Sequence, residues 1–339
     1  MDFEEFRDSL AEELGERMYQ KTGESYTFEN THVERLTRGD YDGFAIRKED
    51  SQIGMNLDCG PLFQKYEDGM DFDEVVEMAE RMVEDGMSHT PQVNVEELMN
   101  YDLMKERLAV QVVATDRNAE MLENIPHKNI EDMSLVCRFV IGDAEGGIGT
   151  ILINNQMLAQ FGISKEQLFN DALTYAPDLR PSEIIGMQDI LAEMMGIDPS
   201  ELANELGVPD DVEISVPMYV ASTKDRTEGA GVIAYPGFMD MAAEKLGGDF
   251  FLLPSSTHEV ILVPDNGARD YLELERMVRD VNETQVEPGE RLSDRVYHYD
   301  SKDKVFELAE KYEARKQTKE KDMEKAKKLK ARSKGGIII

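Results

Sequence analysis

The stretch that does most to decide the fold is LPSSTHEVILVPD, residues 253–265. Within it, the short polar segment SST joins the apolar run DFFLLP to the apolar run HEVILVP, and this loop length and composition predict a β-hairpin. Serine and threonine hydroxyls bond neighbouring backbone groups in turns, whereas Pro254 cannot donate to a strand ladder. We therefore expect two paired strands with Ser255, Ser256 and Thr257 at the hairpin tip.

The same tip holds the chain's main candidate site residues, Ser255, Ser256, His258 and Glu259. A nucleophilic serine needs a base within hydrogen-bond reach, a group that orients the base, and oxyanion donors. Neighbours on a strand point to opposite faces, so His258 and Glu259 are not expected to form a relay. The stretch also lacks the GxSxG and HExxH motifs. We interpret the tip mainly as structure, with a ligand or partner contact and a hydrolase site as alternatives.

Charge limits the partners that the folded body can bind. The 339 residues include 70 acidic and 37 basic ones, for a net charge of −33. Residues 311–334 carry 11 basic and 4 acidic residues, net +7, which leaves −40 on the rest of the chain. Such a body repels phosphate backbones and membrane surfaces. We expect no nucleic acid and no membrane as partners of the body, and mimicry of nucleic acid remains a minor alternative.

The composition also limits which compartment and which cofactors we expect. The chain starts with MDFEEFRDSLAEEL, acidic where a secretory signal is basic, and no apolar run approaches the ~18 residues of a membrane span. Cys59 and Cys137 lie far apart, and the five histidines lack the spacing of metal sites. We therefore expect a soluble, cytoplasmic protein without disulfide, metal or cofactor.

The first part of the chain predicts helix, strands, helix and further strands. Phe3, Phe6, Leu10, Leu14 and Met18 recur at helical spacing. Apolar runs then predict a hairpin over residues 42–58, a turn at Gly60 and Pro61, and a helix from Asp71 or Asp73 with one apolar face. Strands are expected near residues 108–115, 135–142 and 149–155, followed by two helices, the second capped by Ser164. The apolar face of the helix that begins at Asp71 or Asp73 comprises Val75, Val76, Ala79, Met82 and Val83.

The second part predicts a similar mixture. We expect a helix over 182–196, strands over 214–222 and 231–235, and a helix over 239–247. After the hairpin, Asp265 or Asn266 is expected to cap a helix. The predicted fold class is α+β, with mixed or antiparallel sheets flanked by helices in two subdomains. The expected segments are an N-terminal subdomain over 1–176, a helical connector over 177–212, a C-terminal subdomain over 213–310, and a basic tail over 311–339 that is helical or disordered.

Four long blocks carry a resemblance to a known family. They are LAVQVVATDRNAEMLENIPHKNIEDMSLVCRFVI (108–141), VPMYVASTKDRTEGAGVIAYPG (216–237), LPSSTHEVILVPD and MVRDVNETQVEPGERLSDRVYHYD (277–300). They resemble an uncharacterised domain-of-unknown-function family common in clostridia and related gut bacteria. The resemblance reaches to about Asp300 and leaves out the basic tail. It implies no activity, cofactor or catalytic residue.

The leading functional hypothesis is a non-enzymatic cytoplasmic interaction or accessory protein, and the partner that this hypothesis expects is another protein. It rests on the acidic body, the basic tail and the lack of a recognisable catalytic motif. The first alternative is a small-molecule enzyme or hydrolase that uses the region of Ser255, Ser256, His258 and Glu259. The second alternative is an acidic decoy for a DNA-binding protein.

Overall fold

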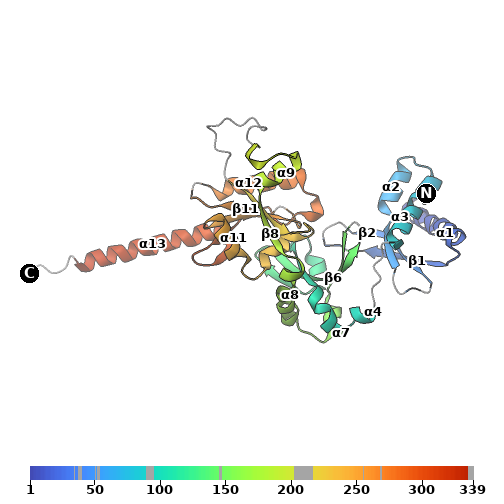
Figure 1. The fold of residues 1–339 in the computed structure, drawn as a ribbon, viewed down its shortest axis with the longest axis horizontal. Helices are drawn as coiled ribbons and strands as arrows, with labels where there is room; N and C mark the ends of the chain where they lie inside the picture. Colours follow the sequence, from blue (N-terminus) through green and yellow to red (C-terminus); the bar gives the residue numbers. More distant parts are fainter. Residues whose placement is uncertain are drawn as a thin grey trace, which may run out of the picture. The chain divides into compact units, whose positions relative to one another are not determined.

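A computed structural model gives the fold of the chain (Figure 1). It describes residues 1–33, 35–36, 40–49, 51, 54–88, 95–144, 147–201, 217–254, 256–267 and 269–334. The chain forms two compact units: unit 1 comprises residues 1–101 and 140–151, and unit 2 comprises residues 102–139 and 152–339. This division is discontinuous in sequence, whereas the subdomains expected over 1–176 and 213–310 are continuous. The α+β class, with antiparallel sheets flanked by helices, is confirmed.

Unit 1 is built on a three-stranded antiparallel sheet in the order β1-β2-β3. Its elements are α1 (Phe3–Thr22), β1 (Tyr26–Val33), β2 (Tyr41–Lys48), β3 (Gly54–Asp58), α2 (Gly60–Glu67), α3 (Phe72–Ser88) and α4 (Val95–Leu98). The hairpin predicted over 42–58 is confirmed as β2 and β3. The sequence analysis did not predict β1, and the turn expected at Gly60 and Pro61 is instead the first turn of α2, where proline is tolerated because its missing N–H has no helical partner.

Capping residues mark both ends of helix α1. Asp2 accepts a hydrogen bond from the Glu5 N–H, and the Glu5 side chain accepts one from the Asp2 N–H, which together form a capping box. Gly23 ends the helix with a φ of 73°, in the left-handed region that glycine enters at little cost. The predicted apolar stripe is buried at Phe6, Leu10, Leu14 and Met18, whereas Phe3 is only partly buried.

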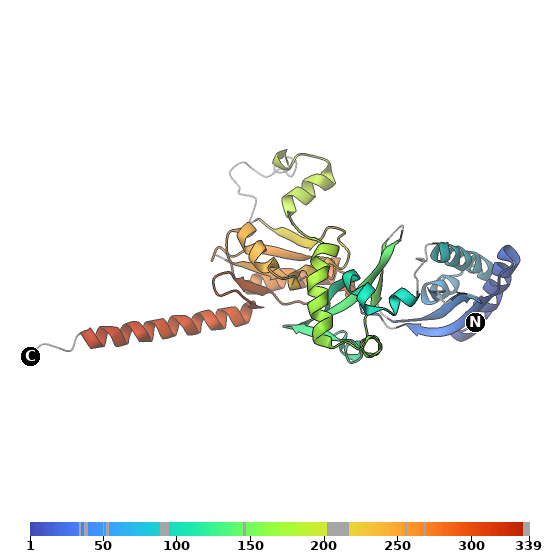
Figure 2. The same ribbon diagram turned by 60° about the horizontal axis from the view of Figure 1, so that its bottom comes forward.

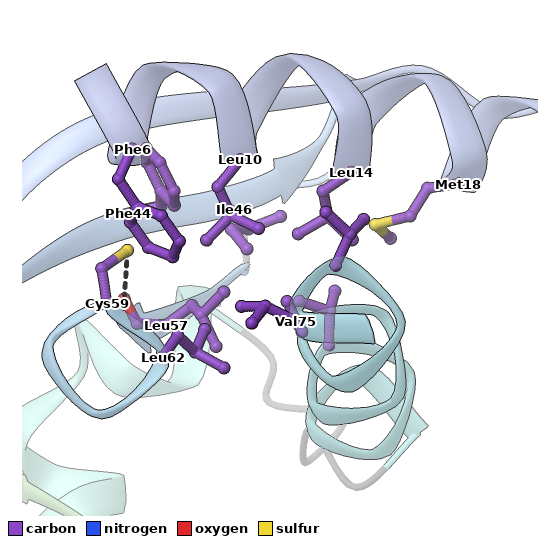
Figure 3. Close-up of a cluster of buried hydrophobic side chains, with 13 residues drawn as sticks. Phe6, Leu10, Leu14, Met18, Phe44, Ile46, Leu57, Cys59, Leu62 and Val75 are labelled. Atoms are coloured by element: carbon purple, nitrogen blue, oxygen red, sulfur yellow. Dashed lines mark hydrogen bonds between the residues drawn. The ribbon is translucent and has the colours of Figure 1, made fainter. Parts of the chain in front are cut away.

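The core of unit 1 lies between α1, α3 and one face of the sheet. Figure 3 shows the α1 stripe facing Phe44 and Ile46 of β2, with Leu57, Leu62 and Val75 completing the cluster. Four of the five residues expected on the buried face of α3 are buried. The exception is Met82, which is 42% exposed.

Unit 2 contains two sheets. In the first, β4 (Leu108–Ala114) pairs with β6 (Met133–Ala144), which also pairs with β5 (His127–Ile130) and β7 (Gly147–Leu152). Residues 140–144 of β6 and 147–151 of β7 are counted with unit 1. The larger sheet has six strands in the order β13-β12-β10-β11-β9-β8, all neighbours antiparallel. Its strands are β8 (Ser182–Gly186), β9 (Tyr219–Thr223), β10 (Phe250–Leu253), β11 (Val260–Pro264), β12 (Tyr297–Asp300) and β13 (Val305–Leu308).

Helices flank these sheets, as both views show (Figures 1 and 2). They are α5 (Tyr101–Met104), α6 (Ala119–Leu122), α7 (Asn155–Phe161), α8 (Lys165–Leu179), α9 (Met187–Met195), α11 (Phe238–Leu246), α12 (Tyr271–Gln285) and α13 (Ala309–Lys334). The described residues also form the 3₁₀ turns η1 (Lys105–Arg107), η2 (Pro199–Glu201), η3 (Gly229–Ala234) and η4 (Pro288–Glu290). The predicted cap of α8 is confirmed, because Ser164 Oγ accepts from the Gln167 N–H at 3.1 Å.

Three local predictions are wrong. Residues 182–186, expected to be helical, form β8, because pairing of Ile184 with Ala221 extends the larger sheet. Residues 231–235, expected to be a strand, belong mainly to η3, where a Cβ on Gly231 would lie 2.5 Å from the Val110 carbonyl oxygen. Asp270, rather than Asp265 or Asn266, caps α12.

None of the helices in the described part of the chain is long and apolar enough to cross a membrane.

Candidate functional site

The hairpin predicted from LPSSTHEVILVPD is confirmed. Strands β10 and β11 pair antiparallel, from Phe250 opposite Pro264 to Leu253 opposite Ile261. The connecting loop covers residues 254–259, so His258 lies in the loop and not on the strand, as does Glu259. Ser255 lies outside the described residues.

The loop is held between two other segments of unit 2. Thr257 is only 2% exposed; its N–H donates to the Glu290 carbonyl at 2.9 Å, and its carbonyl accepts from the Ala230 N–H at 3.1 Å. Ser256 forms an isolated antiparallel bridge with Arg291. The tip is therefore packed against η3 and η4.

Both ring nitrogens of His258 have partners. Nδ1 accepts a hydrogen bond from the Glu228 backbone N–H at 3.1 Å. Because that group can only donate, Nδ1 carries the lone pair, and the neutral ring carries its proton on Nε2. Nε2 lies 3.3 Å from Glu290 Oε1. The imidazole thus bridges the loop before η3 to η4.

Ser256 contacts the backbone of His258 and not its ring. Ser256 Oγ accepts from the His258 N–H at 3.2 Å, the pattern of a local serine turn. A general base must present a free lone pair to the serine hydroxyl, and the only ring lone pair of neutral His258 already binds the Glu228 N–H. Glu259 is partly buried and is not joined to His258 by any hydrogen bond between the described residues. These contacts hold the loop in place and do not form a serine–histidine catalytic pair.

The sequence analysis missed the acidic and basic groups that complete this cluster. Glu228 Oε2 lies 3.6 Å from Arg138 Nε, and Arg138 Nε also donates to Gln111 Oε1 at 2.7 Å. Glu228 has a φ of 50° and directly precedes Gly229, where a Cβ would lie 2.1 Å from Ser222 Oγ. Only the glycine spacing in TEGAG could have signalled such a close approach.

A second polar cluster fixes the loop after β9. The Arg180 side chain is 4% exposed and donates to both carboxylate oxygens of Asp225, at 3.0 and 2.6 Å. Burial alone would raise the pKa of Asp225, but hydrogen bonds from Arg180, from the Thr227 N–H and from Thr223 hold that pKa below its usual range. Arg180 also donates to the Thr227 carbonyl. The carboxylate therefore orders a tight loop around a buried guanidinium.

A third cluster anchors the start of α13. The Tyr312 ring stacks on the His298 ring, with centroids 3.6 Å apart and planes 13° apart. His298 is 0% exposed, and its Nε2 lies 3.1 Å from Asp265 Oδ2. The hydrogen bond with His298 holds the pKa of Asp265 below its usual range, and burial raises the pKa of Tyr312 to about 12. This end of α13 belongs to the packed fold.

Ion pairs reinforce the anchor. The Arg315 guanidinium bonds three carboxylates, Asp300 at 3.1 Å, Asp303 at 2.5 Å and Glu307 at 2.6 Å. Lys319 also pairs with Asp303. Residues 311–319, expected to lie in a tail separate from the fold, are therefore attached to unit 2. We call residues 309–319 the anchor segment.

The remainder of α13, residues 320–334, is called the basic arm. It contains seven basic and three acidic residues. All its residues from 320 to 327 are exposed, and Lys325 pairs with Asp322 of the same helix at 3.7 Å. Figures 1 and 2 both show α13 extending away from the strands of unit 2. Residues 320–327 thus present their charged side chains to solvent.

Among the described residues, neither the two cysteines nor a cluster of metal ligands provides a further candidate site. Cys59 and Cys137 are free and fully buried, and burial raises the pKa of both thiols, that of Cys59 to about 12. A buried neutral thiol is a poor nucleophile. Within the described ranges, no group of three histidine, cysteine or acidic residues could hold a metal ion.

Comparison with known proteins places the chain in one family. Neither the curated proteins nor the solved structures contain a match. The model of a family of unknown function, DUF5688, matches residues 3–301, which leaves β13 and α13 outside the match. The chain belongs to this DUF5688 family of unknown function.

Proposed function

We propose that this chain is a non-enzymatic interaction protein of the cytoplasm that binds an anionic macromolecule through the basic arm. The observation that carries the proposal is the contrast within α13. The anchor segment is fixed to unit 2 by a ring stack and a set of ion pairs, whereas the side chains of residues 320–327 are exposed. The proposal concerns residues beyond the family match, which ends at Ser301.

The anchor segment helps the basic arm to form a helix. A free helix of about 15 residues is marginal in water, because its first turn is costly to form. The anchor segment supplies those first turns, so the arm propagates from a helix that is already nucleated. Like charges along the arm repel one another, and the pairing of Lys325 with Asp322 offsets only part of that repulsion. An anionic partner would offset it.

The hydrolase alternative has weaker support from the geometry. It requires His258 to take a proton from a serine, and both ring nitrogens of His258 are engaged with Glu228 and Glu290. Those contacts, the Thr257 backbone bonds and the Ser222 hydroxyl bonded to the His258 carbonyl at 2.7 Å support a structural role for the loop.

Retention on immobilised heparin, a sulfated polysaccharide, tests the proposal. A chain of net charge −33 is repelled by heparin unless a local basic segment binds it. We expect the full chain to be retained at about 50 mM salt and to elute as salt rises, and a chain ending at Lys319 to flow through. The Lys325→Glu/Lys327→Glu variant should also flow through.

The matched control is Lys65→Glu/Lys165→Glu, which makes the same change of net charge at exposed residues outside the arm. Retention of this control with the full chain would assign binding to the arm. The proposal is wrong if the full chain flows through, or if the shortened chain is retained equally well.

A further inference from the structure

Helix α9 is amphipathic, but much of its apolar side is exposed. Successive residues of an α-helix are rotated by about 100°, so Met187, Leu191 and Met194 lie along one side, with Ile190 and Met195 at its borders. In a helix that packs on its own protein, such a side is normally buried. Here Met194, in the middle of the side, is 80% exposed, and Leu191 is 39% exposed. We call these five residues the α9 face.

Both ends of α9 are hydrogen-bonded. The helix follows β8, the outer strand of the larger sheet (Figure 1), and the Met187 N–H donates to the Met218 carbonyl at 2.8 Å. At the other end, the Ile197 N–H donates to the Ala192 carbonyl at 3.0 Å. Ala192 is the fully buried residue of the helix, and it lies about 160° around the axis from Met194. The α9 face is therefore turned away from the buried side of its helix.

The composition of the α9 face suits contact with a partner. Leu191, Met194 and Met195 are all exposed within five positions, and Met194 is the most exposed large apolar residue in the described part of the chain. Single exposed apolar residues are ordinary on a protein surface, whereas a group of them marks an interaction site. Methionine side chains are flexible and polarizable, so they adapt to the shape of a partner. We therefore expect a partner with an apolar side of its own.

The charge around the α9 face restricts that partner. Residues 182–201 contain five acidic residues and no basic one. Asp189, Glu193, Asp198 and Glu201 are exposed, and none of them forms an ion pair with a described basic residue. A partner that covers the apolar side chains must bring positive charge to these carboxylates, because complementary charge selects the partner and like charge repels it. A second copy of α9 would bring the same carboxylates, and α13 has no apolar stripe.

We propose that the α9 face is a docking site for a basic amphipathic helix of another protein. This partner is distinct from the anionic one assigned to the basic arm. The nine residues of α9 span about 14 Å, so the two helices meet over two to three turns. The apolar side of the partner packs on Leu191 and Met194, and its lysine or arginine side chains meet Asp189 and Glu193.

Fluorescence anisotropy of a labelled leucine–lysine peptide of about 14 residues, with its leucines on one side of a helix, tests the inference. At about 150 mM salt, we expect the full chain to bind the peptide at least 10-fold more tightly than a Leu191→Ser/Met194→Ser variant, because the apolar contacts are lost. The matched control is Leu272→Ser/Met277→Ser, the same change at exposed residues of α12, and it should bind as the full chain does.

Two further proteins test the charge and the location of the site. Asp189→Asn/Glu193→Gln should bind the peptide at least about 3-fold more weakly, and its binding should depend less on salt. The chain ending at Lys319 should bind the peptide as tightly as the full chain, which separates this site from the basic arm. Unchanged binding by Asp189→Asn/Glu193→Gln, or loss of binding in the shortened chain, would contradict the proposed site.

Control peptides and two other ligands complete the test. A peptide of the same composition whose leucines are spread around the helix should bind at least about 10-fold more weakly. Equal binding of that peptide, or of the designed peptide to Leu191→Ser/Met194→Ser, would overturn the inference, because the acidic body would then attract any polycation. Sedimentation with phosphatidylcholine vesicles, or a dimer of the chain, that is lost in Leu191→Ser/Met194→Ser would assign the α9 face to a membrane or to a second copy and would also overturn it.

Discussion

The ring of Tyr312 lies flat on the ring of His298, with centroids 3.6 Å apart. This stack joins the first turns of α13 to β12, a strand of the larger sheet, at a side chain that is fully buried. The arm is therefore an extension of the folded unit and not a separate tail.

Truncation should separate the anchor segment from the basic arm. A chain that ends at Lys319 should have the same free energy of unfolding in urea as the full chain, within about 0.5 kcal/mol, because residues 320–327 are exposed. A chain that ends at Glu310 loses Tyr312 and Arg315 and should be about 2 to 4 kcal/mol less stable. Equal stability of all three chains would contradict the anchoring that we describe.

Asp225→Asn should destabilise the protein in a pH-dependent way. At about pH 7 we expect a cost of 2 to 4 kcal/mol, because the buried Arg180 guanidinium loses its charged partner. The pKa of Asp225 is lowered in the folded protein, so the carboxylate stabilises the fold above its ordinary pKa. That stabilisation is lost as pH falls through the folded pKa, where the native residue also becomes neutral.

Urea unfolding at about pH 7, 5 and 3 measures this difference. The gap between the native chain and Asp225→Asn should narrow below about pH 4, whereas Asp178→Asn, at an exposed residue of α8, should show no gap at any pH. A gap that stays constant down to pH 3 would show that the charge of Asp225 is not what stabilises the loop.

Gly229→Ala should be costly although the residue has no side chain to lose. An added Cβ would lie 2.1 Å from Ser222 Oγ and 2.7 Å from the His258 carbonyl oxygen. We expect a loss of about 1 to 3 kcal/mol, since the backbone has to move. Gly60→Ala is the control, because its Cβ would meet only a side-chain oxygen of Asp58 at 3.3 Å. A Gly229→Ala protein as stable as the control would contradict the close packing of this loop.

The two partners of His258 can be tested separately. Asn at position 258 keeps an acceptor near the place of Nδ1, for the Glu228 N–H, whereas Gln places its polar group near Nε2 and Glu290. We expect His258→Asn to be about 1 kcal/mol more stable than His258→Gln in urea unfolding, because it leaves no backbone donor unpaired. The reverse order would mean that the Glu290 contact matters more.

A fluorophosphonate probe addresses the hydrolase alternative directly. We expect no labelling, because Ser256 accepts from the His258 backbone N–H and faces no free imidazole lone pair. A stoichiometric adduct on a serine of this loop that disappears in a folded His258→Asn protein would establish hydrolase chemistry.

The sequence predicted elements whose signals are local. The α1 stripe and the β10–β11 hairpin follow from apolar spacing and turn residues, and both are confirmed. Residues 182–186 form a strand because β9 supplies the partner, and the pattern IIGMQDIL alone favours a helix. The run GVIAY predicts a strand, but Gly231 packs against the backbone of Val110, on a strand far away in the sequence.

The candidate site was less predictable, because its partners meet only in the folded protein. The sequence pointed to Ser256 and His258, but Glu228 and Glu290, which fix the ring, lie about thirty residues away on either side. The Tyr312–His298 stack likewise joins a strand to a helix that carries no apolar stripe. Spacing rules detect amphipathic elements, and a single aromatic ring on a charged helix gives no periodic signal.

The central claim is that the basic arm is the part of the chain that binds its partner, and hydrogen–deuterium exchange of the full chain with and without heparin tests it most directly. In the free chain, amides of residues 320–334 should exchange rapidly, and those of the anchor segment slowly. Saturating heparin should slow exchange in 320–334 by at least about 10-fold and leave residues 254–259 unchanged. Protection confined to residues 254–259 or to unit 1, with none in the arm, would contradict the claim.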